Sequence, residues 1–303
     1  MVDLRQFRQF VAVAEEMSFR RAAQRLNMAQ PPLSAAVRRI ENELGVVLLE
    51  RSRRVVRLTE PGRVFLDEAK RTIAQADRAI TTAQRAGHGT VGYLRVTFVP
   101  VMAHDLLPSV LRAFRERHPG IELELVEAPT GQQVPLLMSE QCDIGLVVLP
   151  LMEGTGLMLE TVYRDRLVAA VPRTHRLAAR RKIALADLRN EPWILCPPQQ
   201  APGFCTHVAT ACATAGFVPQ VAQHAVQMST ILGLVAGHLG VCVVPASLVK
   251  RRADLAFRPL TGPGTPINYD LGAVWRGDGL QPALMAFLET IRTVMRHRPV
   301  RTN

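Results

Sequence analysis

Residues 18–45 read SFRRAAQRLNMAQPPLSAAVRRIENELG, and this stretch decides the fold of the first part of the chain. Ser18 is a good N-cap for a short helix that ends near Leu26. Gln30-Pro31-Pro32 opens the next helix, because proline is tolerated only in a helix's first turn. Apolar residues then recur at helical spacing until Gly45, at Leu33, Val37, Ile40 and Leu44. Two helices joined by a tight turn predict a helix-turn-helix, preceded by a further helix on Leu4, Phe7, Phe10, Val11 and Ala14.

The second of these two helices is the candidate recognition helix, because its early turns carry polar and basic residues on the exposed face. These residues are Gln30, Ser34, Arg38 and Arg39. Two β-rich segments follow at 46–50 and 55–58, and Arg51-Ser52-Arg53-Arg54 lies between them. We therefore expect a hairpin with a positively charged tip, which makes the domain a winged helix-turn-helix that is all-α apart from the wing.

The charge of the chain indicates a polyanionic partner. The 303 residues include 37 Lys and Arg against 26 Asp and Glu, which gives a formal net charge of +11. Residues 18–57 alone hold nine arginines and three glutamates. Because the planar guanidinium group matches phosphates and guanine edges, double-stranded DNA is the expected partner.

Length and composition exclude several other classes of protein. The chain is long enough for about two domains, and its apolar runs are far shorter than the roughly 18 residues of a membrane-spanning helix. No apolar signal segment stands at the N-terminus, so we expect a cytoplasmic protein. The five cysteines form no C-x-x-C pair, which argues against a disulfide framework or a zinc ribbon. No catalytic motif is present, and we expect no enzyme, no cofactor and no metal site.

A long helix is predicted from Thr59-Glu60-Pro61 onward, where a capping residue precedes a proline. Its apolar seam consists of Leu66, Ala69, Ile73, Ala76, Ile80 and Ala83. We interpret this seam as a dimerisation surface, and the alternative is that the helix packs on its own domain. Residues 87–92, GHGTVG, match G-x-G-x-x-G in letters, but they follow a helix and precede a strand. They are therefore interpreted as a hinge and not as a dinucleotide site.

From Leu94 onward, predicted strands and helices alternate, which is typical of an α/β domain with a mainly parallel sheet. Two such series in tandem suggest two lobes with a cleft between them. Ligands of open α/β sheets bind at the carboxyl ends of strands. Here those ends lie near 99–102, 128–130 and 147–149.

The stretch from Phe10 to Gly62 resembles the winged helix-turn-helix of LysR-type transcriptional regulators. The combination of A-Q-P-P-L-S at 29–34, R-x-I-E-x-E-L-G at 38–45 and L-T-E-x-G at 58–62 is specific to that family. The likeness continues in LLPSVLRAFRERHPGIELEL at 106–125 and GLVAGHLGVCVVPAS at 233–247. The resemblance implies a homotetramer, built from homodimers, that binds promoter DNA and contacts RNA polymerase. It also implies an effector domain of two periplasmic-binding-protein-like lobes that hold a small inducer.

The resemblance divides the chain into a DNA-binding domain at 1–60, a linker helix and hinge at 61–90, and an effector-binding domain at 91–303. Lobe I comprises 91–163 and 265–303, and lobe II comprises 164–264. DNA contacts are expected from the recognition helix and the wing, at Gln30, Pro31, Pro32, Ser34, Arg38, Arg51, Arg53 and Arg54. Inducer contacts are expected at Pro100, Val101, Met102, Thr130, Val148, Pro202, Phe204, Met228 and Ser229.

Within this family, the sequence EPWILCPPQQAPGF at 191–204 resembles regulators of aromatic-compound breakdown. One departure is Val148, which stands where muconate-responsive members have an arginine. None of the expected cleft residues is charged, so a ligand with two carboxylates is disfavoured there. We expect a mostly apolar inducer with at most one anionic group, such as an aromatic acid or a phenol.

The sequence leaves three alternatives to a ligand-controlled regulator open. Cys196 and Cys205 are nine positions apart, as are the redox cysteines of the peroxide-sensing branch of the same family, so a thiol-based sensor is the first alternative. A stand-alone solute-binding protein requires an export signal that is missing. An α/β enzyme requires acid or base groups at the strand ends, where this chain has Pro, Val, Met and Thr.

Overall fold

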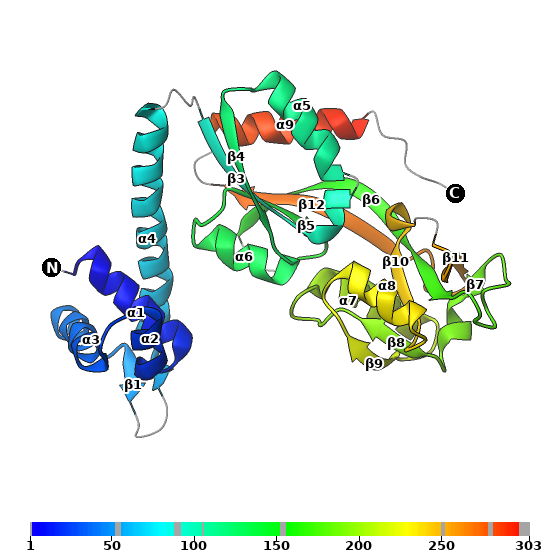
Figure 1. The fold of residues 1–303 in the computed structure, drawn as a ribbon, viewed down its shortest axis with the longest axis horizontal. Coiled ribbons are helices and arrows are strands. Elements are labelled where there is room, and N and C mark those ends of the chain that lie inside the picture. Colours follow the sequence, from blue (N-terminus) through cyan, green and yellow to red (C-terminus); the bar gives the residue numbers. More distant parts are fainter. Residues whose placement is uncertain are drawn as a thin grey trace. The chain divides into compact units, whose positions relative to one another are not determined.

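The computed structural model describes residues 2–51, 56–87, 92–104, 106–151, 156–249, 252–277 and 281–296 (Figure 1). The chain divides into two compact units, essentially Met1–Thr90 and Val91–Asn303. Most of the predicted hinge, 88–91, lies outside the described residues.

The N-terminal unit contains the predicted helices and the wing. Helix α1 spans Leu4–Glu16, α2 spans Phe19–Arg25 and α3 spans Gln30–Leu44. The short strands β1 (Leu49–Arg51) and β2 (Val56–Leu58) pair in antiparallel fashion, and the long helix α4 runs over Glu60–Gly87. Two predicted helix ends are confirmed. The Ser18 side chain accepts a hydrogen bond from the Arg21 amide, and Gly45 ends α3 with a φ of +70°.

The wing is held against the start of α4 by the residues of the L-T-E-x-G motif. The Thr59 hydroxyl accepts a hydrogen bond from the Gly62 amide at 3.0 Å and donates to the Val47 carbonyl at 2.7 Å. A Cβ atom on Gly62 would lie 2.0 Å from the Leu48 carbonyl oxygen, so only glycine fits this position. The motif therefore joins the wing to the long helix.

The first part of α4 packs inside the N-terminal unit. Phe65 stacks on Phe7 with ring centroids 5.4 Å apart, and it meets Phe10 edge-on at 5.0 Å. Ala69 is fully buried, and Leu66 packs against the core of this unit. The predicted dimer seam is therefore wrong at Leu66 and Ala69, because the aromatic cluster turns this side of the helix toward its own domain. Farther along, Ile80 is 58% exposed.

The C-terminal unit has a mixed sheet in the order β4-β3-β5-β12-β6-β11-β7, and β10 also pairs with β6. Strand β3 is parallel to β4 and β5, whereas β12 and β6 run antiparallel to their neighbours. The prediction of a mainly parallel sheet is therefore wrong, because the antiparallel strands β12 and β6 lie in the middle of the sheet. The elements are β3 (Gly92–Phe98), η1 (Pro100–His104), α5 (Leu106–Arg117), β4 (Ile121–Glu127), α6 (Thr130–Met138), β5 (Ile144–Val148), β6 (Leu157–Pro172), β7 (Ile183–Ala184), η2 (Leu185–Leu188), β8 (Pro192–Leu195), α7 (Pro202–Thr214), β9 (Gln220–His224), α8 (Met228–Ala236), β10 (Cys242–Pro245), η3 (Ala246–Leu248), β11 (Leu255–Thr261), β12 (Asn268–Arg276) and α9 (Pro282–Arg296).

The long strand β6 connects the two lobes of this unit. It pairs with β12 from Leu157 to Arg166, and from Leu167 to Pro172 it pairs with β10 and β11 instead. The chain returns to lobe I through β12, which also pairs with β5. Two strands therefore pass between the lobes, and the ligand cavity described below lies beside them.

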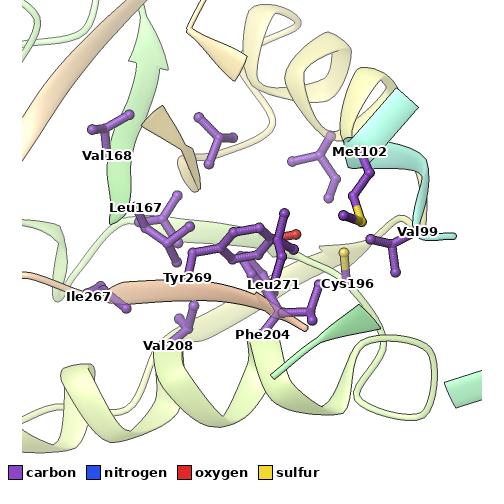
Figure 2. Close-up of a cluster of buried hydrophobic side chains, with 14 of the residues drawn as sticks. Val99, Met102, Leu167, Val168, Cys196, Phe204, Val208, Ile267, Tyr269 and Leu271 are labelled. Carbon is purple, nitrogen blue, oxygen red and sulfur yellow. The ribbon is translucent and has the colours of Figure 1, made fainter. Parts of the chain in front are cut away.

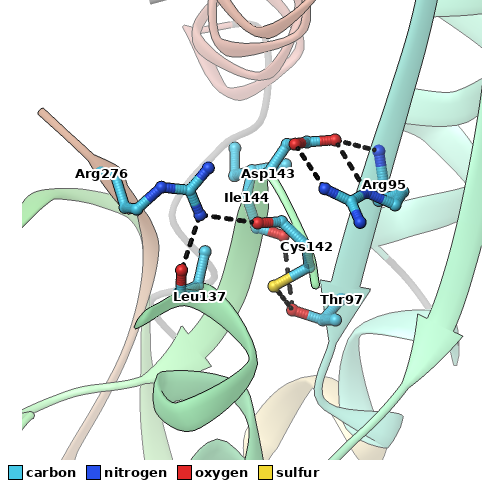
Figure 3. Close-up of polar contacts among 7 residues, drawn as sticks. All are labelled: Arg95, Thr97, Leu137, Cys142, Asp143, Ile144 and Arg276. Carbon is cyan, nitrogen blue, oxygen red and sulfur yellow. Dashed lines mark hydrogen bonds and ion pairs between the residues drawn. The ribbon is translucent and has the colours of Figure 1, made fainter. Parts of the chain in front are cut away.

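A buried polar network fixes the central strands of lobe I (Figure 3). Arg95 on β3 donates to Asp143 at 3.1 Å, and the Asp143 side chain is only 4% exposed. Arg276 on β12 donates to the carbonyl oxygens of Leu137 at 2.6 Å and Cys142 at 3.0 Å. Burial raises the pKa of the Cys142 thiol to about 11, so this thiol stays neutral and structural. On the outer side of lobe I, α5 and α9 lie together (Figure 1).

Candidate DNA-binding surface and ligand cavity

Helix α3 has one buried face and one exposed face, as a recognition helix requires. Leu33, Val37 and Ile40 are fully buried in the core of the N-terminal unit. On the opposite face, Gln30, Pro31, Pro32 and Arg38 are exposed and Ser34 is half-buried. These five predicted DNA-binding residues therefore share an accessible surface.

The arginines of this surface differ from others in the same unit. Arg38 and Arg39 line an open concavity with Pro31, Ser34, Ala35 and Asn42. Neither arginine has a carboxylate within ion-pair distance among the described residues. Arg25 on α2, by contrast, lies 2.8 Å from a Glu15 carboxylate oxygen and 3.6 Å from one of Glu16. The guanidinium groups of Arg38 and Arg39 are thus exposed, without an ion-pair partner among the described residues, and available to a phosphate.

The wing is only partly described. Arg51 ends β1, while Arg53 and Arg54 lie outside the described residues. The base of the wing is fixed to α3 through Glu41, whose carboxylate accepts hydrogen bonds from the amides of Leu48 at 3.0 Å and Leu49 at 3.1 Å. The R-x-I-E motif therefore orients the wing relative to the recognition helix.

A cavity of about 60 Å³ lies between the lobes of the C-terminal unit, at the carboxyl ends of β3 and β5. Lobe I contributes η1 and the start of α6, lobe II contributes the loop after β8 with α7 and α8, and β12 closes one side. The lining residues are Val99, Pro100, Val101, Pro129, Thr130, Val148, Cys196, Gln200, Ala201, Phe204, Val226, Met228 and Tyr269.

Six of the nine predicted inducer contacts line this cavity: Pro100, Val101, Thr130, Val148, Phe204 and Met228. Met102 does not, because the η1 turn directs it into the core, where it is 1% exposed (Figure 2). Pro202 occupies the first turn of α7 and lies outside the lining, since that helix turns Phe204 inward instead. Ser229 is exposed, and Met228 is the residue of α8 that faces the cavity.

Sequence reasoning missed the other seven lining residues: Val99, Pro129, Cys196, Gln200, Ala201, Val226 and Tyr269. Most of them lie next to a predicted contact or in the 191–204 stretch, so the strand-end rule could have included them. Tyr269 is different, because it reaches the cavity from a strand that returns from lobe II. Only the pairing of β12 with both β5 and β6 places it there.

The lining has no charged side chain and few polar groups. The Thr130 hydroxyl accepts a hydrogen bond from the Val148 amide at 3.1 Å, so its own proton remains free to be donated. The Tyr269 ring meets Phe204 edge-on at a centroid distance of 6.1 Å (Figure 2). Burial raises the pKa of Tyr269, so this side chain is a neutral phenol and a hydrogen-bond donor. The cavity therefore suits an apolar molecule with one hydrogen-bonding end.

The two cysteines of the redox alternative are close together but poorly activated. The Cys205 thiol donates to the Cys196 carbonyl oxygen at 3.3 Å. Burial raises the pKa of Cys196 to about 12 and also raises the pKa of Cys205. Because the thiolate is the reactive form, these surroundings do not favour oxidation by peroxide.

Across the described ranges, no group of three His, Cys, Asp or Glu side chains is arranged to hold a metal ion. Within the same ranges, no helix combines the length and apolar character needed to span a bilayer.

Hydrogen bonds join the lobes in addition to apolar packing such as that of Phe204 on Tyr269. The Gly131 amide donates to the Gln200 carbonyl at 3.2 Å, and the Gln132 side chain donates to that of Gln200 at 3.3 Å. A third hydrogen bond joins Gln227 to Glu127 at 3.3 Å. A Cβ atom on Gly131 would lie 1.9 Å from the Gln199 carbonyl oxygen, so this glycine allows the lobes to approach backbone to backbone. The hydrogen bonds between the lobes therefore add modestly to the apolar packing that joins them.

An N-terminal helix-turn-helix with exposed arginines on its second helix, followed by a two-lobed α/β unit with an uncharged cavity, defines a DNA-binding protein with a ligand-binding domain. Residues 4–63 match the bacterial regulatory helix-turn-helix protein family, lysR type, and residues 87–296 match the LysR substrate binding domain. The chain belongs to the LysR family of transcriptional regulators.

Individual relatives cover nearly the whole chain. It is 34% identical to the HTH-type transcriptional regulator AlsR of Bacillus subtilis (strain 168) over 95% of this chain and 94% of that one. It is 37% identical to the HTH-type transcriptional regulator IlvR of Caulobacter vibrioides over 96% and 97% of the two chains. Among solved structures, full-length CbnR in complex with its target DNA is similar, with a TM-score of 0.70 and 30% identity over 96% of this chain and 99% of that one.

Proposed function

We propose that this regulator binds promoter DNA through the exposed face of α3 and the wing, and that a small inducer in the cavity between its lobes modulates this binding. The observation that carries the proposal is the cavity itself: its lining is uncharged, and it lies between the two lobes. The similarity to CbnR, which has been solved with its target DNA, supports the assignment of the DNA surface.

The proposed inducer is mostly apolar, has at most one anionic group and is an aromatic acid or a phenol. The cavity of about 60 Å³ is small, so we expect the lobes to part or a side chain to move when a ring enters. Met228 is suited to such a movement, because methionine is unbranched and adapts to irregular spaces. The Phe204 ring offers an edge or a face to the ring of the ligand.

The proposed assembly is a homotetramer built from homodimers, in the cytoplasm, with RNA polymerase as a further partner. The exposed part of α4 around Ile80 supports pairing of this helix beyond its contact with its own domain. A thiol-based mechanism is the weaker candidate, because burial raises the pKa of both cysteines.

Calorimetric titration of the full-length protein with benzoate, phenol and cis,cis-muconate tests the ligand class. We expect benzoate or phenol to bind more tightly than muconate, and Phe204→Leu to weaken that binding. Val218→Ala is the control, because Val218 is 81% exposed and outside the cavity lining. Tight binding of muconate with no effect of Phe204→Leu contradicts the proposal. A gel-shift assay with the DNA upstream of the gene, with and without the bound compound, then tests modulation.

A further inference from the structure

The strongest unexplained feature of the cavity is the Tyr269 hydroxyl. Tyr269 is only 4% exposed, and its ring lies among apolar side chains that include Leu271 and Phe204. Figure 2 shows its hydroxyl as the one oxygen in this cluster, directed toward Val99, Met102 and Cys196. Tyr269 also lines the ligand cavity.

This hydroxyl makes no hydrogen bond to any of the residues that the structure describes. Asp165, its cross-strand neighbour on β6, is already engaged, because its two carboxylate oxygens accept from the amides of Arg166 at 2.7 Å and Ser247 at 3.0 Å. The Cys196 thiol is directed to the Val226 carbonyl at 3.7 Å. Because this hydroxyl is partly accessible and Tyr269 lines the cavity, a molecule bound in the cavity can accept its hydrogen bond.

We propose that Tyr269 determines inducer specificity, by donating a hydrogen bond from its hydroxyl to a single oxygen acceptor on an otherwise apolar ligand. This inference rests on the proposed inducer site and identifies the side chain that distinguishes between ligands in it. The ligand class is a small, ring-sized compound with one carbonyl, carboxylate or phenolic oxygen. Thr130 also lines the cavity, and its hydroxyl, which accepts from the Val148 amide, can donate to a ligand as well. With no cationic side chain in the lining, a neutral acceptor suffices.

The position of Tyr269 in the fold gives this hydrogen bond a second consequence. Tyr269 lies on β12, a strand that returns from lobe II to lobe I, and its ring packs on Phe204 of lobe II. A ligand held by Tyr269 is therefore fixed at the junction of the lobes. The acceptor group of the ligand is thus bound next to contacts between the two lobes.

The first test uses the ligand-free, full-length protein. Because the Tyr269 hydroxyl has no partner, Tyr269→Phe leaves the melting temperature of the C-terminal unit unchanged or raises it. The matched control is Thr97→Val, since the Thr97 hydroxyl is also buried but donates to the Gln133 side chain at 3.0 Å. We expect that control to lower the melting temperature by roughly 2–4 °C. A similar decrease for Tyr269→Phe means that the hydroxyl has an internal structural role and overturns the inference.

The second test compares two neutral ring probes by calorimetry, acetophenone with one acceptor oxygen and toluene with none. We expect Tyr269→Phe to weaken acetophenone about five- to tenfold and to change toluene binding less than about twofold. Phe204→Leu should weaken both probes, because it alters the apolar wall that they share.

The outcomes separate the inference from the function on which it rests. If neither probe nor benzoate binds the wild-type protein, the aromatic inducer site is refuted, and the role of Tyr269 with it. If both probes bind and respond to Phe204→Leu, but Tyr269→Phe affects them equally or not at all, only the role of Tyr269 is refuted.

Discussion

Replacement of Arg38 with alanine tests the electrostatics of the recognition helix, and Arg25→Ala is its matched control. Both residues are exposed arginines of the N-terminal unit, but Arg25 is paired with Glu15 and Glu16, and its pKa is raised chiefly by the hydrogen bond to Glu15. Arg38 has no such partner within the described part of the chain. Each phosphate contact contributes about 0.9 to the slope of log K against log salt concentration, because binding releases a condensed counterion. We therefore expect Arg38→Ala to reduce the slope by about 0.9 and Arg25→Ala to leave it nearly unchanged.

The size of this effect can be measured by fluorescence anisotropy with a labelled duplex of arbitrary sequence. Between about 50 and 200 mM salt, a slope difference of about 0.9 changes the ratio of wild-type to Arg38→Ala affinity roughly three- to fourfold. The effect should be the same for duplexes of different sequence, since it reflects charge and not base recognition. Equal slopes for Arg38→Ala and Arg25→Ala would refute the conclusion that α3 carries the available positive charge.

Three further predictions concern the C-terminal unit. Gly131→Ala places a Cβ against the Gln199 carbonyl and forces the lobes apart. Because overpacking costs about 1–3 kcal/mol, this substitution should weaken benzoate binding at least about fivefold. Gly233→Ala is the control and should have no such effect, because no heavy atom lies within 4 Å of the added Cβ. Iodoacetamide should alkylate Cys196 at pH 8 about a thousandfold more slowly in the native protein than in the unfolded chain, because burial raises the pKa of the Cys196 thiol from 9.0 to about 12. Peptide mass spectrometry measures both rates, and comparable rates would restore the redox alternative. Glu160→Gln removes the ion pair with Arg292, which lowers the pKa of Glu160 from 4.5. A carboxyl group with a lowered pKa stabilises the fold at pH values above 4.5, and this stabilisation is lost as the pH falls through the lowered pKa. The difference in urea stability between wild type and Glu160→Gln should therefore disappear in acid. A difference that persists in acid contradicts the stabilising role of the Glu160–Arg292 ion pair.

The DNA-binding unit could be predicted from the sequence because its signals are local. Ser18 and Gly45 cap neighbouring helices, and both positions are confirmed. The predicted dimer seam on α4 is wrong at Leu66 and Ala69 for a different reason. Periodicity shows which residues share a helix face, but it does not show what covers that face, and here Phe65 brings α4 onto α1. Which element packs on a given helix face depends on the tertiary fold, and the spacing of apolar residues along the helix does not reveal it.

The cavity was placed at the right sheet edge but with an incomplete lining. The strand-end rule identified Pro100, Thr130 and Val148, because the ends of parallel strands meet at one edge. It gave no information on the direction of each side chain, so it included Met102, Pro202 and Ser229, which do not line the cavity. It also missed Tyr269, whose position depends on the pairing of β12 between β5 and β6 across the two lobes.

A ligand can shift the balance between open and closed lobes only by binding the two states with different affinity. Among the described residues, the lobes are joined by hydrogen bonds with donor–acceptor distances of 3.2–3.3 Å and by apolar packing such as that of Phe204 on Tyr269, and a neutral hydrogen bond contributes about 0.5–1.5 kcal/mol. A ligand that contacts only Thr130 and Val148 of lobe I binds both states equally and changes nothing. One that also packs on Phe204 and Met228 of lobe II loses those contacts when the lobes part. Because the lining residues come from both lobes, a small molecule can favour one arrangement of the lobes over the other. Substitutions in the lining of either lobe should therefore change the effect of the inducer on DNA binding as strongly as they change inducer affinity.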